Sequence, residues 1–347
     1  MMLMKRWWQW GIGLLVGLAM LSWGQSGSAN SVGFEVAPVA SKYQVDKAVS
    51  YYDLKLKPDQ TTTLAVRITN TSTQEVTVHT GVATATTNPN GVVEYQAAST
   101  GKNIDLPVNV SQLITTTDDK LTLAKGTSKL VTFKVKMPAH KYDGVVVGGL
   151  SFLKKAAGQQ RKSAMAIKNQ YAYSVAVVLH GDQPLAKNRL TLGKIDATQN
   201  NGYNQISLAL QNRTAAFLNQ VKTDVKIYSR GGHQVRYKQV NQHGQIAPNS
   251  VYELPLRVGR NALKPGAYTA KVAVTSKKQH WTFTKDFEIT SARAKQLNKT
   301  AVIEHHVNWW LWISLGLLTL ILLWVAWYIH RKQQKIKRLE AQLKAKK

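Results

Sequence analysis

The chain lacks cysteine and has few acidic residues. Among its 347 residues there is no cysteine, and 46 Lys and Arg face 18 Asp and Glu, for a formal net charge of +28. The absence of cysteine excludes the disulfide framework that stabilises many small secreted domains. The acidic residues are scattered, without the paired carboxylates that glycosidases require. The excess of positive charge indicates anionic surroundings or partners.

Catalytic motifs are also missing. No Gly-x-Ser-x-Gly occurs, and the Ser-x-x-Lys spacing of Ser151 and Lys154 falls in a predicted strand rather than at the start of a helix, with no accompanying Lys-Thr-Gly. His305 and His306 are adjacent in a polar segment, which is typical of a solvated stalk rather than of a metal site. The sequence therefore predicts no enzyme, no metal site and no cofactor.

The N-terminus has the three parts of a secretory signal peptide. Lys5 and Arg6 precede an uncharged run at 11–23, and small residues follow at 25–29. The apolar run is about 13 residues, shorter than the roughly 20 that a spanning helix needs. We therefore predict a signal peptide at 1–29, although an uncleaved N-terminal anchor is the alternative.

The C-terminus contains the single long apolar run that fits a membrane span. Residues 309–329 carry no charge and, as a helix, would extend about 31 Å. Tryptophans lie at both ends of this run, where aromatic rings prefer the headgroup level. The tail at 330–347 is strongly basic, with Glu340 as its single acidic residue, which predicts a cytoplasmic location. The expected topology is a single-pass membrane protein with an extracellular N-terminal ectodomain, associated with the cell wall or surface.

The expected ectodomain keeps a strong positive charge. Outside the signal peptide and the tail, 36 Lys and Arg face 17 Asp and Glu. Because export makes nucleic acid an unsuitable partner, the expected partners are peptidoglycan or another anionic wall polymer, lipid headgroups and acidic surface proteins.

Period-two alternation dominates this region. In 63–69, Leu64, Val66 and Ile68 point to one side, and in 129–136 the same holds for Val131, Phe133 and Val135. Such runs are typical of antiparallel strands that are buried on one face. Further strands are predicted at 144–153, 171–179 and 281–289, and no convincing amphipathic helix precedes the apolar run.

A recurrent turn phrase supports two β-sandwiches. An apolar residue followed by a turn precedes a predicted strand at 56–59, 123–126, 246–249 and 263–266. In immunoglobulin-like sandwiches such corners carry the chain from one sheet to the other. We predict sandwiches at 30–183 and 184–291, a polar spacer at 292–308, and then the membrane helix.

Candidate binding residues lie mainly in the first predicted sandwich. The tyrosines could stack on sugar rings, although a tyrosine in a sandwich is more often part of the core, and the basic residues flank a predicted hairpin loop that could contact an anionic polymer or simply be solvated. These candidates are Tyr51, Tyr52, Tyr95, Tyr142, Tyr171, Lys154, Lys155, Arg161 and Lys162. The glycines at 148 and 149 indicate a close backbone approach, most simply a central strand beneath a neighbour.

Short phrases throughout the chain resemble one family. They are FEVAPV at 34–39, YDLKLKPDQ at 52–60, ATTNPNG at 85–91, MP at 137–138, YDGVVVGG at 142–149, IKNQYAY at 167–173, LQN at 210–212, APNS at 247–250, KPGAY at 264–268 and WTFTKDF at 281–287. In these phrases the chain resembles the WxL-interacting proteins of Gram-positive bacteria. The resemblance implies a peptidoglycan-binding first domain, a second domain that binds host or matrix proteins, and association with WxL-domain surface proteins.

The expected protein is thus an all-β ectodomain of two immunoglobulin-like β-sandwich domains followed by a single C-terminal transmembrane α-helix. The leading hypothesis is a non-enzymatic scaffold or adhesion protein. The alternative is an ectodomain sensor or assembly factor that signals through the membrane helix to a cytoplasmic partner.

Overall fold

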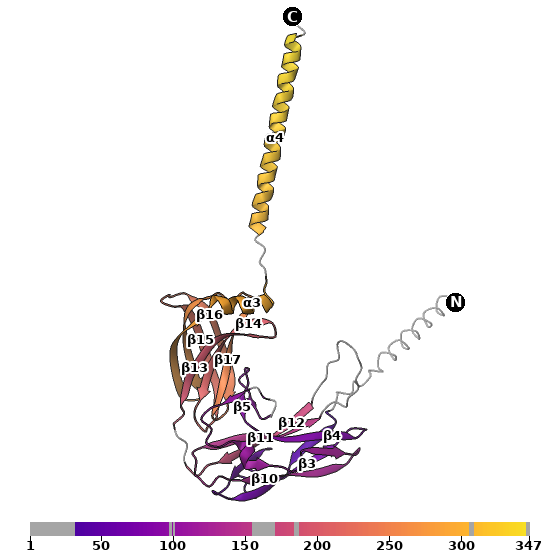
Figure 1. Ribbon diagram of the computed structural model, residues 1–347, viewed down its shortest axis with the longest axis vertical. Coiled ribbons are helices and arrows are strands. Elements are labelled where there is room, and N and C mark those ends of the chain that lie inside the picture. The colour runs from indigo at the N-terminus through magenta and orange to yellow at the C-terminus, as the bar shows by residue number, and fades with distance from the viewer. Residues whose placement is uncertain are drawn as a thin grey trace, which may run out of the picture.

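A computed structural model describes residues 32–96, 99, 101–154, 171–183, 187–304 and 309–344 (Figure 1). The predicted signal peptide lies outside these residues. The part of the chain that is described folds into two β-sandwiches, a short helix against the end of the second, and a long C-terminal helix. The all-β fold class predicted for the ectodomain is confirmed.

The first sandwich has two sheets whose strands are mixed along the sequence. One sheet has the order β1 (Phe34–Pro38), β3 (Thr61–Asn70), β10 (Ser128–Lys136), β8 (Ile114–Thr115). The other has the order β2 (Tyr52–Lys55), β12 (Tyr171–His180), β11 (Val145–Lys154), β4 (Val76–Thr84), β9 (Lys120–Leu123). The pairing of β12 with β2 is parallel. A single helical turn, α2 (Val110–Leu113), packs Val110 and Leu113 into this core.

The second sandwich is built from longer strands. One sheet has the order β13 (Leu190–Asn200), β14 (Tyr203–Asn212), β17 (Ser250–Gly259), β7 (Lys102–Asn103). The other has the order β16 (Val235–Ile246), β15 (Leu218–Ser229), β18 (Gly266–Ser276), β19 (Gln279–Ile289). Helix α3 (Ser291–Thr300) follows β19, and helix α4 (Trp309–Lys344) is the candidate membrane span.

The alternation in the sequence determines which side chains form each core. Leu64, Val66 and Ile68 of β3 are buried, and Phe133 of β10 is fully buried against Phe152 of β11 with an edge-to-face ring contact at 6.0 Å. Because successive strand residues point to opposite faces, the intervening polar residues remain outside. The predicted faces of these strands are therefore confirmed.

All four predicted corners carry the chain from one sheet to the other. They connect β2 to β3, β9 to β10, β16 to β17 and β17 to β18. The last residue of each phrase has a positive φ: Asp59, Gly126, Asn249 and Gly266. Glycine, asparagine and aspartate tolerate this conformation best, which explains why these residue types occupy the position.

Residues 85–105 leave the first sandwich and reach the second. This segment, here called the junction arm, includes β5 (Thr86–Thr87), β6 (Val93–Glu94) and β7, with residues 97, 98 and 100 outside the description. Strand β7 pairs with β17, so the first sandwich completes a sheet of the second. A small apolar cluster joins Ala85, Val93 and Val147 to Ala247 of the second sandwich.

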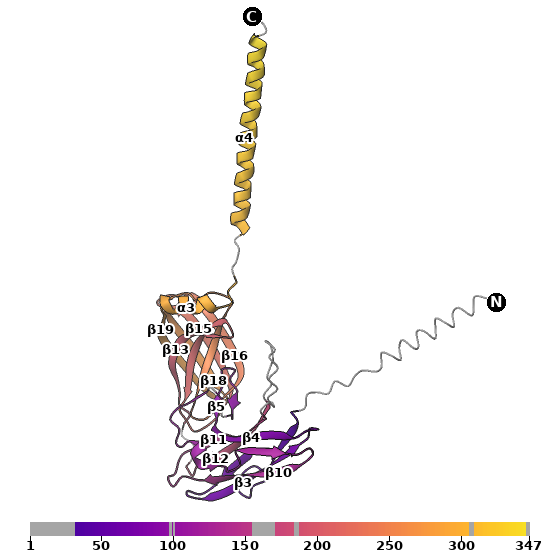
Figure 2. The same cartoon turned by 45° about the vertical axis from the view of Figure 1, so that its right-hand side comes forward.

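Polar contacts hold the junction arm in place. The buried Thr87 hydroxyl accepts from the Ala247 N–H at 3.0 Å and contacts the Ser250 hydroxyl at 2.7 Å. The Ile104 N–H donates to the Asn249 carbonyl at 2.8 Å. With these contacts the second sandwich stands on one end of the first, and both views show α3 at the opposite end of the second sandwich (Figures 1 and 2).

The segment expected to be a polar spacer begins as a packed helix. The Thr290 side chain caps α3 by accepting from the Arg293 N–H, and Ala294 and Leu297 are buried in the second core. The prediction of a spacer from residue 292 is wrong for 292–300. Its two buried apolar residues are too few to indicate a helix, and a helix this short depends on tertiary packing.

Candidate binding surfaces

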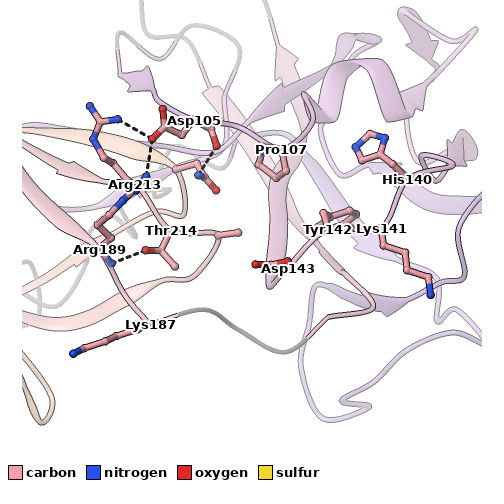
Figure 3. A pocket seen from close by; sticks show the side chains of 12 residues that line it. Asp105, Pro107, His140, Lys141, Tyr142, Asp143, Lys187, Arg189, Arg213 and Thr214 are labelled. Carbon is pink, nitrogen blue, oxygen red and sulfur yellow. Dashed lines mark hydrogen bonds and ion pairs between the residues drawn. The ribbon is translucent and has the colours of Figure 1, made fainter.

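A polar cleft lies between the two sandwiches at the junction. It encloses about 520 Å³ and is lined from the first sandwich by the junction arm and the 140–143 segment and from the second by the loops that precede β13, β15 and β17. Arg189 and Arg213 both reach the carboxylate of Asp105, at 3.3 and 2.8 Å (Figure 3). The backbone carbonyl of Asp105 accepts from the Asn249 side chain at 2.7 Å.

These contacts give the cleft a structural role. The Asp105 carboxylate contacts both guanidinium groups, which leaves one net positive charge in the cluster, and Arg213 also donates to Gln211 and Thr191. Lys141 and Lys187 extend away from this cluster (Figure 3). The Arg213 donors are thus engaged within the protein, and the cluster joins the arm to the second sandwich, while the Arg189 side chain remains 66% exposed.

A second hollow lies on the first sandwich beside Tyr51. It encloses about 740 Å³ between the end of β1 and the start of β2 and is lined by residues that include Val39, Lys42, Lys47 and Tyr51. The Gln44 side-chain amide shapes this loop, because it donates to the backbone carbonyls of both Asp46 and Tyr51, which follow it in the chain. We call this hollow the Tyr51 groove.

The Tyr51 groove combines an aromatic ring with cations. The Tyr51 side chain is partly exposed, and partial burial followed by the carboxylates of Asp53 and Asp46 raises the pKa of its phenol. The phenol therefore stays protonated at neutral pH and can donate a hydrogen bond. Lys42 and Lys47 line the same hollow, with the Lys42 ammonium 5.1 Å from the centre of the Tyr43 ring. A hollow that holds an aromatic face and cations is suited to a sugar ring that carries carboxylate groups.

A row of lysines crosses the exposed face of the second sandwich. Lys226 of β15 lies directly opposite Lys238 of β16 and Lys271 of β18. All three are exposed, and Lys226 forms a loose ion pair with Asp224 at 3.6 Å. Like charges in direct cross-strand positions destabilise a sheet, so this lysine row carries a cost that the rest of the sheet must offset.

Two of the tyrosines predicted to bind a ligand are core residues. Tyr52 is 1% exposed, its hydroxyl donates to the Ala65 carbonyl at 2.7 Å, and burial raises its pKa to about 12. Tyr142 is 6% exposed and donates to the Leu179 carbonyl at 3.1 Å, and burial raises its pKa as well. Both tyrosines belong to the core of the first sandwich, although Tyr52 also lines the Tyr51 groove and Tyr142 the cleft at the junction.

The other predicted residues that the structure describes lie in two places: Tyr95 in the junction arm, and Lys154 directly opposite Tyr171 on strands β11 and β12. Tyr95 packs against the small apolar cluster that joins the two sandwiches. A Cβ on Gly149 would lie only 2.4 Å from the Tyr95 Cβ, which confirms the predicted close approach at this glycine. Lys154 donates to the Val32 carbonyl at 3.1 Å. Lys155, Arg161, Lys162 and the side chain of Tyr171 lie outside the described residues. Of the predicted set, Tyr51 alone lines the groove as an exposed side chain within the described part of the chain.

Sequence reasoning missed the partners of Tyr51. Lys42 and Lys47 come from a loop without alternation, and their presence in the same groove as Tyr51 depends on how that loop folds back. The sequence does contain one indication of this groove, since two lysines closely precede an aromatic pair. Spacing along the chain, however, does not indicate which of these side chains line the same hollow.

Family models match both sandwiches. The model of the peptidoglycan binding domain of WxL Interacting Protein matches residues 34–154, and that of the host binding domain of the same protein matches residues 162–299. The chain belongs to the WxL-interacting protein family. Its second match reaches residue 299 and so includes most of α3. It also begins before β12, which pairs with β11 and β2 of the first sandwich.

The matched families are binding domains, and they indicate a binding role at the cell surface. No curated protein matches the sequence. Weak structural likeness extends to the YadV chaperone, with 11% identity and a TM-score of 0.30 over 74% of this chain and 100% of that one. It also extends to the DraB chaperone of E. coli, with 14% identity and a TM-score of 0.28 over 74% and 97%.

Proposed function

We propose that this chain is a non-enzymatic scaffold at the surface of a Gram-positive cell. The first sandwich binds peptidoglycan, and the second binds WxL-domain proteins or host matrix proteins. The observation that carries this proposal is the correspondence of one binding-domain family to each sandwich, in the order of the chain. The junction arm supports a scaffold role, because it fixes the two binding units relative to each other.

Helix α4 anchors the scaffold in the membrane. Residues Trp309–Arg338 are long and apolar enough to span a bilayer, and they are not buried against the rest of the protein. The basic residues from Arg331 onward support a cytoplasmic C-terminus, with both sandwiches outside. Deleting 331–347 should leave ligand binding by the scaffold intact, whereas a sensor that signals through α4 would lose its output.

The glycan site that the geometry favours is the Tyr51 groove. Its exposed aromatic ring offers a stacking face for a sugar, and Lys42 and Lys47 are suited to the carboxylates of the attached peptides. The groove is formed by residues of the first sandwich, and Tyr51 lies close enough to Tyr95 of the junction arm to contribute, after burial, to raising the pKa of the Tyr95 phenol.

Retention of the ectodomain, residues 32–304, on purified insoluble peptidoglycan tests this proposal. We expect Tyr51→Ala to lower the affinity about 2- to 12-fold, as the loss of about 0.5–1.5 kcal/mol of aromatic contact implies. Tyr203→Ala, which removes a ring of similar exposure from the second sandwich, is the matched control and should bind as the unmodified ectodomain does. Retention that high salt abolishes and that neither substitution changes would mean charge alone, and would contradict a glycan site.

A further inference from the structure

The chain stays attached to the second sandwich almost to the start of α4. After α3, the Val302 N–H donates to the Gly202 carbonyl at 2.8 Å, and the Glu304 N–H donates to the Arg260 carbonyl at 2.9 Å. The side chains of Arg260 and Glu304 pair at 2.5 Å. Helix α4 begins at Trp309, so four residues separate the last attached residue from the helix.

This short connection limits how far the sandwich can lie from the bilayer. Even a fully extended chain covers only about 18 Å between Glu304 and Trp309. Trp309, Trp310 and Trp312 are the residues expected at the headgroup level of a spanning α4. The end of the second sandwich that carries α3 is therefore held within about two helical diameters of the headgroups.

That end of the sandwich is cationic. We define it as the α3 end: helix α3 with residues 301–304 and the loops at 200–203, 230–234 and 260–265. Its single acidic residue, Glu304, is paired with Arg260. Its basic residues are Arg230, Arg260, Lys264, Arg293, Lys295 and Lys299. Arg230 forms an ion pair with Asp286 of β19 at 3.3 Å, so the lysines and Arg293 carry the excess charge.

Helix α3 is fixed firmly enough to present these charges as a surface. The Asn298 side chain both donates to and accepts from the backbone of Leu263, each at 2.9 Å, which ties α3 to the loop before β18. Ala294 and Leu297 are buried, while Lys295 and Lys299 are exposed and lie one turn apart on the same side. Like charges at this spacing repel one another, so an anionic surface would relieve a strain that the free protein carries.

We propose that the α3 end is a lipid-docking surface that rests on anionic phospholipid headgroups of the outer leaflet. The inference depends on the proposed anchoring by α4. Headgroup phosphates attract basic side chains within about a Debye length, roughly 8–10 Å, of the bilayer. A connection of at most about 18 Å lets the α3 end come into this range, where its cations hold it against the headgroups. Docking would set the second sandwich upright on the membrane and hold the first sandwich, with the Tyr51 groove, away from the bilayer.

Site-specific labelling of the full chain tests this docking. Because the sequence contains no cysteine, Gln296→Cys creates a single labelling site on the exposed side of α3. The labelled chain is placed in lipid nanodiscs that contain a headgroup-quencher lipid and either phosphatidylglycerol or only phosphatidylcholine. We expect strong quenching with phosphatidylglycerol, weak quenching with phosphatidylcholine, and little at a control label on Leu130→Cys, an exposed position of the first sandwich.

Charge removal distinguishes docking from simple tethering. Replacing Lys264, Lys295 and Lys299 with Gln should weaken docking more than about a hundredfold, at about fivefold per lysine near an anionic surface. The matched control replaces the lysine row, Lys226, Lys238 and Lys271, with Gln and should leave the quenching unchanged. Equal quenching in both lipids, or quenching that survives the first replacement, would overturn the inference.

Two further outcomes separate this inference from the proposed function. A chain that fails to remain with the nanodiscs would overturn both the anchor and the docking, whereas a chain that inserts with charge-independent quenching overturns the docking alone. Soluble polyglycerol phosphate provides the test for a wall polymer. Loss of quenching on adding it, with no loss in salt of equal ionic strength, would assign the α3 end to a phosphate polymer instead of lipid.

Discussion

The two sandwiches are built to different degrees of regularity. Strands of the second sandwich, apart from β7, have 10–12 residues, whereas those of the first range from 2 to 10. The second sandwich is the plainer module, yet one of its sheets ends in β7, a strand that the first sandwich supplies. The first sandwich, whose strands are less regular, is therefore the one that supplies the connection. Because many of its strands are short, the junction arm is left free to reach the second sandwich.

The largest expected effect comes from the core of the first sandwich. Phe133→Ala should destabilise that core by about 3–5 kcal/mol. Between residues 30 and 304 the sequence contains one tryptophan, Trp281, which packs against the second core. If the junction couples the two domains, Phe133→Ala should shift the midpoint of urea unfolding, followed by Trp281 fluorescence, to a lower urea concentration. Leu130→Ala, at an exposed position of the same strand, is the control, and an unshifted transition in Phe133→Ala would mean that the domains unfold independently.

The next largest effect is expected when a glycine is replaced by alanine, and the result can be compared between one glycine of each sandwich. A Cβ at Gly149 would lie 2.4 Å from the Tyr95 Cβ and 2.6 Å from its carbonyl oxygen, so Gly149→Ala must displace the arm and should cost about 1–3 kcal/mol. A Cβ at Gly193 would meet chiefly the Gln211 side-chain amide, at 2.6 Å, which can move. Gly193→Ala should therefore cost less in thermal unfolding. Equal losses would show that the arm is not tightly seated on β11.

A smaller effect is expected within the junction. Thr87→Val keeps the side-chain shape but removes the acceptor of the Ala247 N–H, and should cost about 1 kcal/mol. Thr269→Val, which removes an exposed hydrogen bond to Asp286 within the second sandwich, is the comparison. The midpoint temperature of thermal unfolding, followed by Trp281 fluorescence, should be lowered more by Thr87→Val than by Thr269→Val. The reverse order would indicate that the junction contributes little to stability.

The smallest effect should be a gain. Lys226→Thr breaks the lysine row and replaces the central lysine with a good strand former, which should stabilise the second sandwich by about 0.2–1 kcal/mol at low salt. The gain should shrink at high salt because screening already weakens the repulsion. Lys222→Thr is the control, since Lys222 lies opposite Thr275 on β18 rather than a lysine. A salt-independent gain would point to strand propensity instead of charge.

Much of the fold could be predicted from local patterns, and little of the candidate site. Alternation located β3, β10 and β19 and, in β3 and β10, the side chains they bury, and the four turn phrases located the crossings between sheets. Tyr51, Tyr52, Tyr95 and Tyr142 had equal standing as candidates. Burial separates them, because Tyr52 and Tyr142 face the core whereas Tyr51 faces the groove. Composition cannot distinguish these cases, since a tyrosine suits both environments.

The sequence by itself determined the sandwich architecture, the cationic character and the apolar C-terminal helix, because each follows from residue types that repeat or accumulate along a stretch of chain. Only the tertiary structure decided how the parts are joined. Strand β7 is two residues long, Thr87 acts through contacts with residues some 160 positions away, and α3 is held by two buried side chains and Asn298. Such features have no period and no local signature. They exist because distant segments meet and satisfy one another's hydrogen bonds and apolar surfaces.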